Sequence, residues 1–180
     1  MRTLRRGPRT TRLARMRQRL FFELSIAAAV IVFDQWTKAL ARAALLLHQE
    51  REVIPGLLNL TRVHNTGMAF GMFQSADVPM KTLLLGLVAG VALIGLTWYA
   101  ATLPAAQRLS RIGLAFIIGG AAGNLIDRFT AGYVLDFVDF YWGGWHFWAF
   151  NVADASINVG VGLMILDLLT ERRHRVPGTV

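Results

Sequence analysis

The stretch TLLLGLVAGVALIGLTWYAATL, residues 82–103, has 22 residues and no charged side chain. An α-helix needs about 20 apolar residues to cross the hydrocarbon core of a membrane, so this stretch predicts a transmembrane helix. Three further apolar segments lie before and after it, at residues 21–47, 112–129 and 149–170. The segment at 112–129 is short and needs flanking residues to span. The sequence therefore predicts a membrane all-α bundle of four transmembrane helices.

The overall composition also indicates a membrane protein. Hydrophobic residues make up 54% of the 180 residues, the mean hydropathy is +0.45, and only 17% of the residues are charged. Soluble domains carry about 25% charged residues. The chain has no cysteine, which excludes disulfides, thiolate metal sites and a cysteine nucleophile.

Basic residues gather at the ends of the apolar segments. Eight arginines lie in the first 19 residues, and three more lie at residues 172–175. The net charge of +8 therefore indicates membrane topology and contact with anionic phospholipid rather than nucleic-acid binding. Because Lys and Arg concentrate on the cytoplasmic side, both termini are expected in the cytoplasm. Residues 48–81 and 130–148 are then expected outside.

We expect a single domain with two basic extensions: a cytoplasmic arm at 1–20, a membrane-embedded domain at 21–170 and a cytoplasmic tail at 171–180. The arm is expected to be disordered or to lie on anionic headgroups. A cleaved signal peptide ending near residues 39–41 is an alternative, as is an organelle transit sequence. Asp34 and Lys38 lie between the apolar run and that cleavage site, which is unusual for a signal peptide.

The segment after the first apolar stretch differs from the helices. Residues 53–56, VIPG, form a turn signal, and residues 58–63, LNLTRV, alternate between apolar and polar side chains as a strand does. This pattern predicts a small β element at the outer membrane surface.

Charged side chains inside apolar segments are energetically costly and mark functional or structural sites. Asp34 and Lys38 lie four residues apart on one helix face, and we expect their ion pair to support the structure. Asn124, Asp127 and Arg128 share a face of the third span. We expect Asp127 to hold helices together and to be kept ionised by its neighbour Arg128. A second possible role for Arg128 is to face a lipid phosphate or a substrate carbonyl.

Two patterns predict close packing between helices. Gly119 and Gly123 have the GxxxG spacing that lets helices approach closely. Asn151, Asp154 and Asn158 lie on one face of the fourth span, which must face protein or a watery cavity. The stripe either joins helices by hydrogen bonds or belongs to an active site.

Asp136 and Asp139 lie in the expected external loop after the third span, among seven aromatic residues between positions 137 and 148. Such aromatic residues form interfacial belts, so a carboxylate there can approach Asp154 near the outer end of the fourth span. Of two adjacent carboxyl groups, one keeps a proton while the other acts as a base. Such a pair can activate water for peptide hydrolysis with neither a metal nor a covalent intermediate. The spacing leaves several pairings open among Asp127, Asp136, Asp139 and Asp154.

Other catalytic designs are not supported by the sequence. It contains no HExxH zinc motif and no Gly-x-Ser-x-Gly elbow, and its four histidines lack ligand spacing. Two alternatives to a protease are a small proton-coupled transporter and a non-enzymatic membrane scaffold. The transporter would be expected to show an inverted repeat and matched broken helices, which the sequence lacks.

Five motifs occur in order along the chain: DQWTK at 34–38, NTGMAFG at 65–71, GGAAGNLIDR at 119–128, VLDF at 134–137 and FNVAD at 150–154. With these motifs the chain resembles lipoprotein signal peptidase, or signal peptidase II, a family of bacterial aspartic proteases. The resemblance covers roughly residues 22–170. The arginine arm matches no catalytic motif and is longer than the family usually shows.

The resemblance implies that Asp136 and Asp154 are the catalytic dyad. It implies that a further set of residues supports the dyad or contacts substrate: Asp34, Lys38, Asn65, Asn124, Asp127, Arg128 and Asn151. It also implies an extracytoplasmic β-cradle and a short interfacial helix. We expect neither a metal nor a cofactor. The substrates would be diacylglyceryl-modified prolipoproteins, cut on the N-terminal side of the lipidated cysteine. We expect a monomer in the bacterial inner membrane, with its active site near the extracytoplasmic face.

Overall fold

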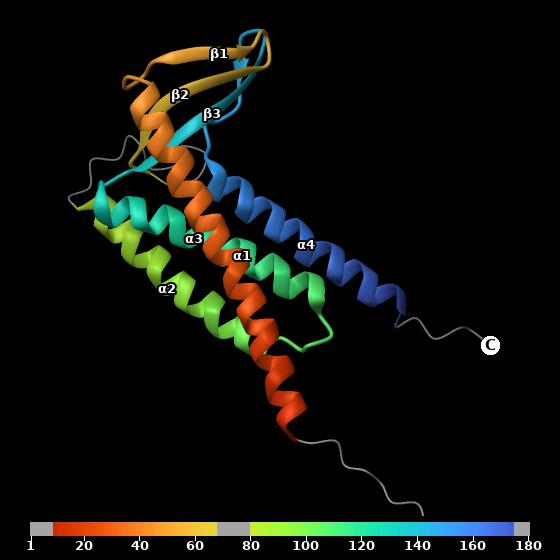
Figure 1. Ribbon diagram of the computed structural model, residues 1–180. Helices are drawn as coiled ribbons and strands as arrows, with labels where there is room; N and C mark the ends of the chain where they lie inside the picture. Colours follow the sequence, from red (N-terminus) through yellow and green to blue (C-terminus); the bar gives the residue numbers. More distant parts are fainter. Residues whose placement is uncertain (1–8, 68–79, 175–180) are drawn as a thin grey trace, which may run out of the picture.

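The computed structural model describes residues 9–67 and 80–174, with side chains described for 14–67 and 80–170. A helical bundle carries an antiparallel sheet at one end (Figure 1). The helices are α1 (Arg9–Ala44), α2 (Lys81–Thr102), α3 (Arg108–Thr130) and α4 (Val152–His174). The strands are β1 (Glu50–Ile54), β2 (Leu58–Asn65), β3 (Val134–Trp142) and β4 (Trp145–His146).

Each of the four helices contains a segment long and apolar enough to cross a membrane: Ala14–Ala44, Lys81–Thr102, Arg108–Thr130 and Val152–Thr170. The four predicted spans are therefore confirmed as helices. Large apolar side chains point outward, and Ile94 and Trp98 on α2 are each 72% exposed. Such surfaces fit helices surrounded by lipid rather than water.

The helix ends differ in part from those expected. α1 begins at Arg9, so the described part of the arginine arm forms a helix rather than a disordered segment. Its residues 9–20, RTTRLARMRQRL, are rich in good helix formers such as Arg, Leu, Ala and Met. Residues 1–8 of the arm lie outside the described residues. α3 extends beyond the apolar segment at both ends, as the short third span requires.

Glycines bring α3 close to its neighbours. Gly119 and Gly123 both face α1, and a Cβ at Gly119 would lie 2.8 Å from the carbonyl oxygen of Ala27. On another side of α3, a Cβ at Gly120 would lie only 2.4 Å from the carbonyl oxygen of Ala153 on α4. A side chain fits at neither position, so glycine is what lets α3 approach α1 and α4 this closely. The close packing predicted from the GxxxG spacing is confirmed.

The sheet has the order β1-β2-β3-β4. The predicted strand is confirmed as β2, which pairs with β1 on one side and β3 on the other. β3 corrects the expectation of an external loop at this position. Its sequence, VLDFVDFYW, is rich in β-branched and aromatic residues but does not alternate, because its first four residues are all buried.

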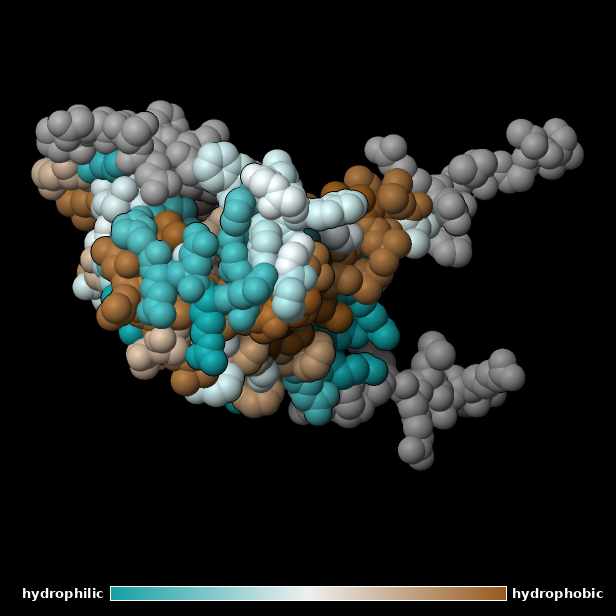
Figure 2. Space-filling model, turned by 90° about the horizontal axis from the view of Figure 1, so that it is seen from above, coloured by the Kyte–Doolittle hydropathy of each residue, from teal (hydrophilic) through white to brown (hydrophobic). Residues whose placement is uncertain are grey.

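A small apolar core joins the sheet to the bundle. Ala41 near the end of α1 packs with Leu135 and Phe137 of β3. Seen from the sheet end, the outer surface carries many hydrophilic side chains, with apolar residues at its margins (Figure 2). No short helix occurs within 9–67 and 80–174, so the interfacial helix stays a prediction.

Candidate active site

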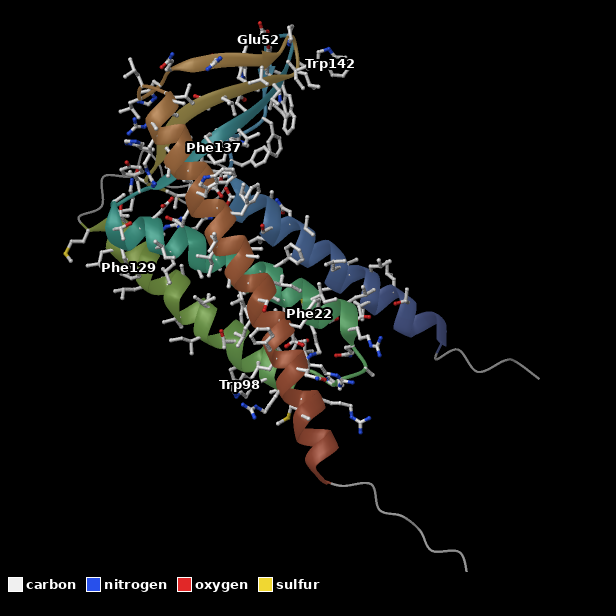
Figure 3. The ribbon with its side chains drawn as sticks, in the orientation of Figure 1. Phe22, Glu52, Trp98, Phe129, Phe137 and Trp142 are labelled. Atoms are coloured by element: carbon white, nitrogen blue, oxygen red, sulfur yellow. The ribbon has the colours of Figure 1, made fainter. Side chains whose placement is uncertain are left out.

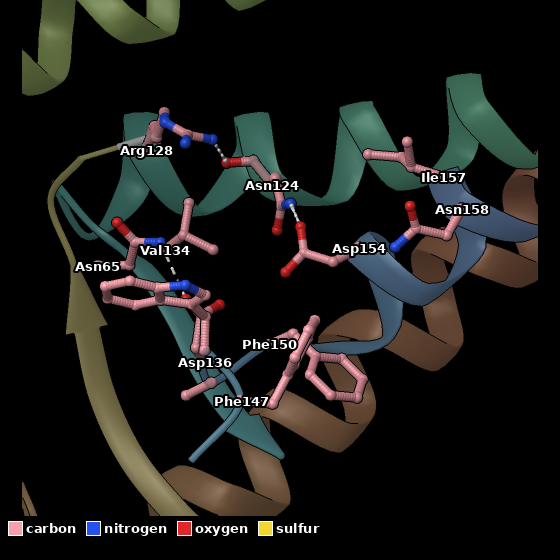
Figure 4. Close-up of a pocket in the computed structure, with 12 residues that line it drawn as sticks. Asn65, Asn124, Arg128, Val134, Asp136, Phe147, Phe150, Asp154, Ile157 and Asn158 are labelled. Carbon is pink, nitrogen blue, oxygen red and sulfur yellow. Dashed lines mark hydrogen bonds between the residues drawn. The ribbon is translucent and has the colours of Figure 1, made fainter. Parts of the chain in front are cut away.

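A cavity of about 370 Å³ opens between the sheet, α3 and the start of α4 (Figure 4). Its lining combines polar and aromatic side chains: Asn65, Asn124, Arg128, Val134, Asp136, Phe147, Trp148, Ala149, Phe150, Asp154, Ile157 and Asn158. Five of the nine predicted site residues line this cavity. The other four are buried and contact the lining residues or one another. The structure therefore brings all nine together in one connected network.

Asp136 lies on β3, where it is only 3% exposed. Asn65 Nδ2 donates to Asp136 Oδ2 at 2.9 Å, and Asn151 Nδ2 donates to Asp136 Oδ1 at 2.7 Å. β2 and β3 explain the first contact, because Asn65 pairs with Val134 and the side chain two residues along β3 lies on the same face. Asp136 is thus a buried strand residue rather than an exposed loop acid.

The surroundings of Asp136 favour its protonated form. Its pKa is raised from the ordinary value of 3.8 to about 7. Burial is the largest cause, and the negative charge of Asp154 adds to it. Hydrogen bonds from Asn65 and Asn151 and the charge of Lys38 act in the opposite direction but do not cancel the shift. Near neutral pH, Asp136 can therefore both hold and release a proton.

Asp154 lies in the first turn of α4 and forms a capping box with Asn151. The backbone N–H of Asp154 donates to Asn151 Oδ1 at 3.0 Å, and the backbone N–H of Asn151 donates to Asp154 Oδ2 at 3.2 Å. Asn151 thus precedes α4 and caps it, rather than extending the polar face of the helix. The second carboxylate oxygen, Asp154 Oδ1, accepts a bond of 2.8 Å from Asn124 Nδ2.

The Asn124 amide is held in one orientation. Its oxygen accepts from Lys38 Nζ at 2.9 Å and from Asn151 Nδ2 at 3.2 Å. Its nitrogen is consequently directed at Asp154 (Figure 4). Lys38 therefore acts on the cavity through Asn124 rather than by direct contact.

A buried ionic cluster lies behind the cavity wall. Lys38 is 0% exposed, and its Nζ lies 2.8 Å from Asp34 Oδ2 and 3.0 Å from Asp127 Oδ2. With Asn124 Oδ1 as the third acceptor, all three ammonium protons have partners. Arg42 Nη2 adds a second cation, 3.0 Å from Asp127 Oδ1. The predicted Asp34–Lys38 pair is confirmed as a contact, and it is part of a larger cluster.

This cluster also holds the two backbone segments that contain Asp136 and Asp154. Asp34 Oδ1 accepts a bond of 2.9 Å from the backbone N–H of Ala153. Asp127 Oδ2 accepts one of 3.1 Å from the backbone N–H of Leu135. Ala153 and Leu135 each immediately precede one of the two cavity aspartates. One set of charges therefore positions both segments.

Arg128 does not pair with Asp127, contrary to the expectation from sequence. Successive helix residues point about 100° apart, and the oxygens of Asp127 contact Lys38 and Arg42 instead. Arg128 lines the cavity, where it donates to the carbonyl oxygens of Asn124 and Gly67 at 3.3 Å each. It forms no salt bridge within the described part of the chain. Its guanidinium can therefore bind a group that enters the cavity.

The structure distinguishes the four aspartates whose pairing the sequence does not decide. Asp136 and Asp154 line the same cavity, whereas Asp127 and Asp139 do not. Asp139 lies three residues from Asp136, so it faces the other side of β3, where its Oδ2 lies 2.8 Å from His146 Nδ1. Within residues 9–67 and 80–174, no group of three or more His, Asp or Glu is placed to hold a metal ion.

Residues 26–170 match the sequence profile of signal peptidase (SPase) II. The chain belongs to the signal peptidase II family. Signal peptidase II is an aspartic protease, so the transporter and scaffold alternatives no longer apply. The family and the four apolar helices together identify a multi-pass protein of the bacterial inner membrane.

Individual relatives resemble most of the chain. A lipoprotein signal peptidase of Symbiobacterium thermophilum is 43% identical over 153 residues, which cover 83% of this chain and 97% of the relative. One of Desulforapulum autotrophicum is 38% identical, covering 80% and 89%. A solved structure described as a bacterial membrane enzyme, determined by the in meso method at 2.3 Å resolution, has a TM-score of 0.76. It is 31% identical, covering 88% of this chain and 94% of that one.

Two further residues contact the predicted site residues of this signal peptidase II family member and were not predicted from the sequence. Arg42 neutralises Asp127, and Gln35 Nε2 donates to Asp34 Oδ2 and to the carbonyl oxygen of Gly123, at 3.1 Å each. Arg42 has a sequence signal, because it lies four residues after Lys38 on the same helix face. Gln35 lies inside the DQWTK motif but next to the charged face, so helical spacing alone does not indicate it.

Proposed function

We propose that Asp136 and Asp154 form the catalytic dyad of an endopeptidase that removes signal peptides from diacylglyceryl-modified prolipoproteins. The cut falls on the N-terminal side of the lipidated cysteine. One observation carries this proposal: two carboxyl groups from different segments line one cavity and share the partner Asn151.

Proton sharing suits this pair to peptide hydrolysis. Burial and a second carboxyl group keep one proton on the pair near neutral pH, since the pKa of Asp136 is about 7. The ionised carboxylate removes a proton from water, and the water oxygen attacks the scissile carbonyl carbon. The protonated carboxyl group hydrogen-bonds the carbonyl oxygen and stabilises its developing charge. The amine then leaves with a proton from the pair, which restores the starting state.

The remaining predicted residues position this pair or the substrate. Asn65, Asn124 and Asn151 orient the carboxyl groups by direct hydrogen bonds. Asp34, Lys38 and Asp127 act one contact further away, through Asn124 and the backbone. Arg128 binds a substrate carbonyl or a lipid phosphate at the cavity wall.

The cavity lining suits a substrate that is both peptide and lipid. Asn65 and Arg128 supply hydrogen-bond donors for a peptide backbone. Apolar side chains supply a surface for the lipid part: Phe147, Trp148, Phe150 and Ile157. A lipid-bearing cysteine stays at the membrane surface, which explains a protease whose site lies at the end of a membrane bundle. The cavity needs no cofactor to perform this hydrolysis.

The proposed topology follows from charge. The arginine-rich N-terminus and the basic C-terminal region lie in the cytoplasm, which places the sheet and the cavity near the extracytoplasmic face. The extracytoplasmic sheet is then the β-cradle that receives the substrate. The chain acts as a monomer in contact with phospholipid, with the arm at 1–20 and the tail at 171–180 flanking one membrane-embedded domain.

The test is cleavage of a diacylglyceryl-modified prolipoprotein by the purified protein. Asp136→Asn and Asp154→Asn should each lower kcat by about 10²–10⁴-fold, the usual contribution of acid–base catalysis. Asp139→Asn is the matched control, because it removes a buried carboxylate from the same strand but outside the cavity. Undiminished cleavage in either dyad variant, or an equal loss in Asp139→Asn, would contradict the dyad. Thermal unfolding of each variant shows whether it is folded.

A further inference from the structure

A second cavity of about 370 Å³ lies between α1 and the start of α3. Phe22, one of its lining residues, lies far along the bundle from Glu52 and Phe137 at the sheet (Figure 3). The proposed catalytic residues line a different cavity. This second cavity therefore has no part in the chemistry described above.

Its lining is strongly basic. The charged and aromatic members are Arg15, Arg19, Phe22, Glu23, Arg108 and Arg111. The residues from α1 are spaced by three, four and seven positions, so they form one face of the helix. Four arginines face a single glutamate, and three positive charges are not neutralised within the lining.

Arg111 and Glu23 hold the cavity wall together. Arg111 Nε lies 2.6 Å from Glu23 Oε1, and Arg111 Nη2 lies 2.7 Å from Glu23 Oε2. Arg111 Nη1 also donates to the carbonyl oxygen of Leu103 at 2.8 Å. This two-point contact joins α1 to α3 and to the end of α2. Arg111 is therefore a structural residue, and its charge is already matched.

The other three arginines have no such partner. Arg15, Arg19 and Arg108 form no salt bridge to any residue that the structure describes. Like charges around one cavity repel one another, and an anion between them removes that repulsion. Guanidinium groups match phosphate oxygens in charge and in hydrogen-bond geometry. A phosphate group is therefore the ligand that this lining fits.

The position of the cavity indicates a lipid rather than a soluble phosphate. Arg15 and Arg19 lie just before the apolar run at 21–47, and Arg108 is the first residue of α3, just before the apolar run at 112–129. Phe22 lies seven residues beyond Arg15 along α1, roughly 10 Å deeper into the bundle, and is 55% exposed. Arginines at headgroup depth with an apolar side chain below them suit a phosphate joined to acyl chains.

We propose that this cavity binds the phosphate group of an anionic phospholipid, with an acyl chain along Phe22. The site goes beyond the proposed peptidase function, since it would tie the basic end of the bundle to the inner leaflet. Binding is measured without substrate, so its result is independent of the cleavage assay.

The test uses the full chain in neutral detergent, titrated with dioleoyl phosphatidylglycerol, dioleoyl phosphatidylcholine or inorganic phosphate. Bound lipid is counted by native mass spectrometry, and thermal unfolding gives the apparent affinity. Phosphatidylglycerol should bind in preference to phosphatidylcholine and raise the unfolding temperature. The variant R19Q/R108Q should weaken phosphatidylglycerol binding by about 25-fold, or about fivefold for each arginine near the surface.

The matched control is R17Q/R51Q, which removes two exposed arginines outside the cavity. It should leave phosphatidylglycerol binding within about twofold of the parent, because neither residue lines the site. Equal binding of the two lipids by the parent, or an equal loss in the control, would overturn the proposal. Inorganic phosphate binding as strongly as phosphatidylglycerol would overturn the assignment to lipid.

Discussion

Asn151 Nδ2 lies 2.7 Å from Asp136 Oδ1, and the same residue caps the helix that carries Asp154. Asn151 therefore contacts both cavity aspartates. Its amide nitrogen positions the Asp136 carboxyl group, and its backbone N–H and amide oxygen hold Asp154 at the start of α4. The two roles use different atoms: the amide nitrogen contacts Asp136, and the amide oxygen caps α4. A substitution can consequently remove one role and keep the other.

Asn151→Ser should separate the geometry of the proposed dyad from the capping of α4. Serine is a good N-cap and can still accept from the backbone N–H of Asp154, so the cap is kept. The free energy of unfolding should fall by about 1–3 kcal/mol, because the buried oxygens of Asn124 and Leu135 lose the Asn151 amide as donor. Its side chain is too short to donate to Asp136. Because misplacement by about 1 Å can lower a rate about 10²-fold, kcat should fall by that order while KM changes little. Steady-state cleavage kinetics and thermal unfolding measure the two effects.

Asn151→Ala provides the comparison, since alanine loses both roles. This variant should show the same loss of kcat and an additional destabilisation of about 1 kcal/mol from the missing cap. If Asn151→Ser keeps the kcat of the parent, the Asn151–Asp136 contact does not orient the dyad.

Lys38→Met should strongly destabilise the fold. The substitution removes the buried cation that contacts both Asp34 and Asp127, and breaking a buried ion pair on one side leaves an uncompensated charge. We expect a loss of about 3–5 kcal/mol in the free energy of unfolding. Chemical unfolding in detergent measures it, and Arg51→Met at the exposed β1 strand is a control that should change little.

The double variant Lys38→Met/Asp34→Asn should recover part of that loss. It removes the carboxylate that Lys38→Met leaves without a cation, because Asp127 keeps Arg42 as its partner. A double variant less stable than Lys38→Met would show that charge balance is not what the cluster supplies.

The four spans could be predicted from the sequence because each depends on a local property. About 20 apolar residues satisfy their backbone hydrogen bonds within one helix, whatever the rest of the chain does. The strand at Leu58–Asn65 could be predicted for the same reason, because apolar and polar residues alternate along its first residues. The order of the five motifs then indicated the family, which residues 26–170 confirm.

The partners of charged residues could not be predicted in the same way. Asp136 reaches the cavity only because β3 pairs with β2, a contact between segments about 70 residues apart, and β3 itself lacks alternation. Arg128 was expected beside Asp127 because the two adjoin in sequence. The helix turn separates them, and Lys38 and Arg42 arrive from α1 instead. Such contacts depend on helix packing rather than on spacing along the chain.

The pKa of Asp136 makes stability depend on pH. Because it is raised from 3.8 to about 7, the folded protein binds more protons than the unfolded chain between these values. The contribution of Asp136 to the free energy of unfolding is therefore fully present below about pH 4. It is lost as the pH rises to about 7, which lowers the free energy of unfolding by up to about 4 kcal/mol. Unfolding measured across this range should lose this slope in Asp136→Asn. Asp139→Asn should keep it, and a slope unchanged in Asp136→Asn would contradict the assignment.

Gly120→Ala should disturb the site without changing any polar group. An added Cβ would lie 2.4 Å from the carbonyl oxygen of Ala153, the residue before Asp154, so α4 must move away from α3. We expect a destabilisation of about 1–3 kcal/mol from overpacking and a fall in kcat of about 10-fold or more as Asp154 shifts. Gly90→Ala on α2 is the matched control, since nothing lies within 4 Å of its added Cβ and alanine is the better helix former. Gly90→Ala should be as stable as the parent or slightly more so. Equal behaviour of the two variants in unfolding and cleavage would show that α3 and α4 tolerate a wider separation at the dyad.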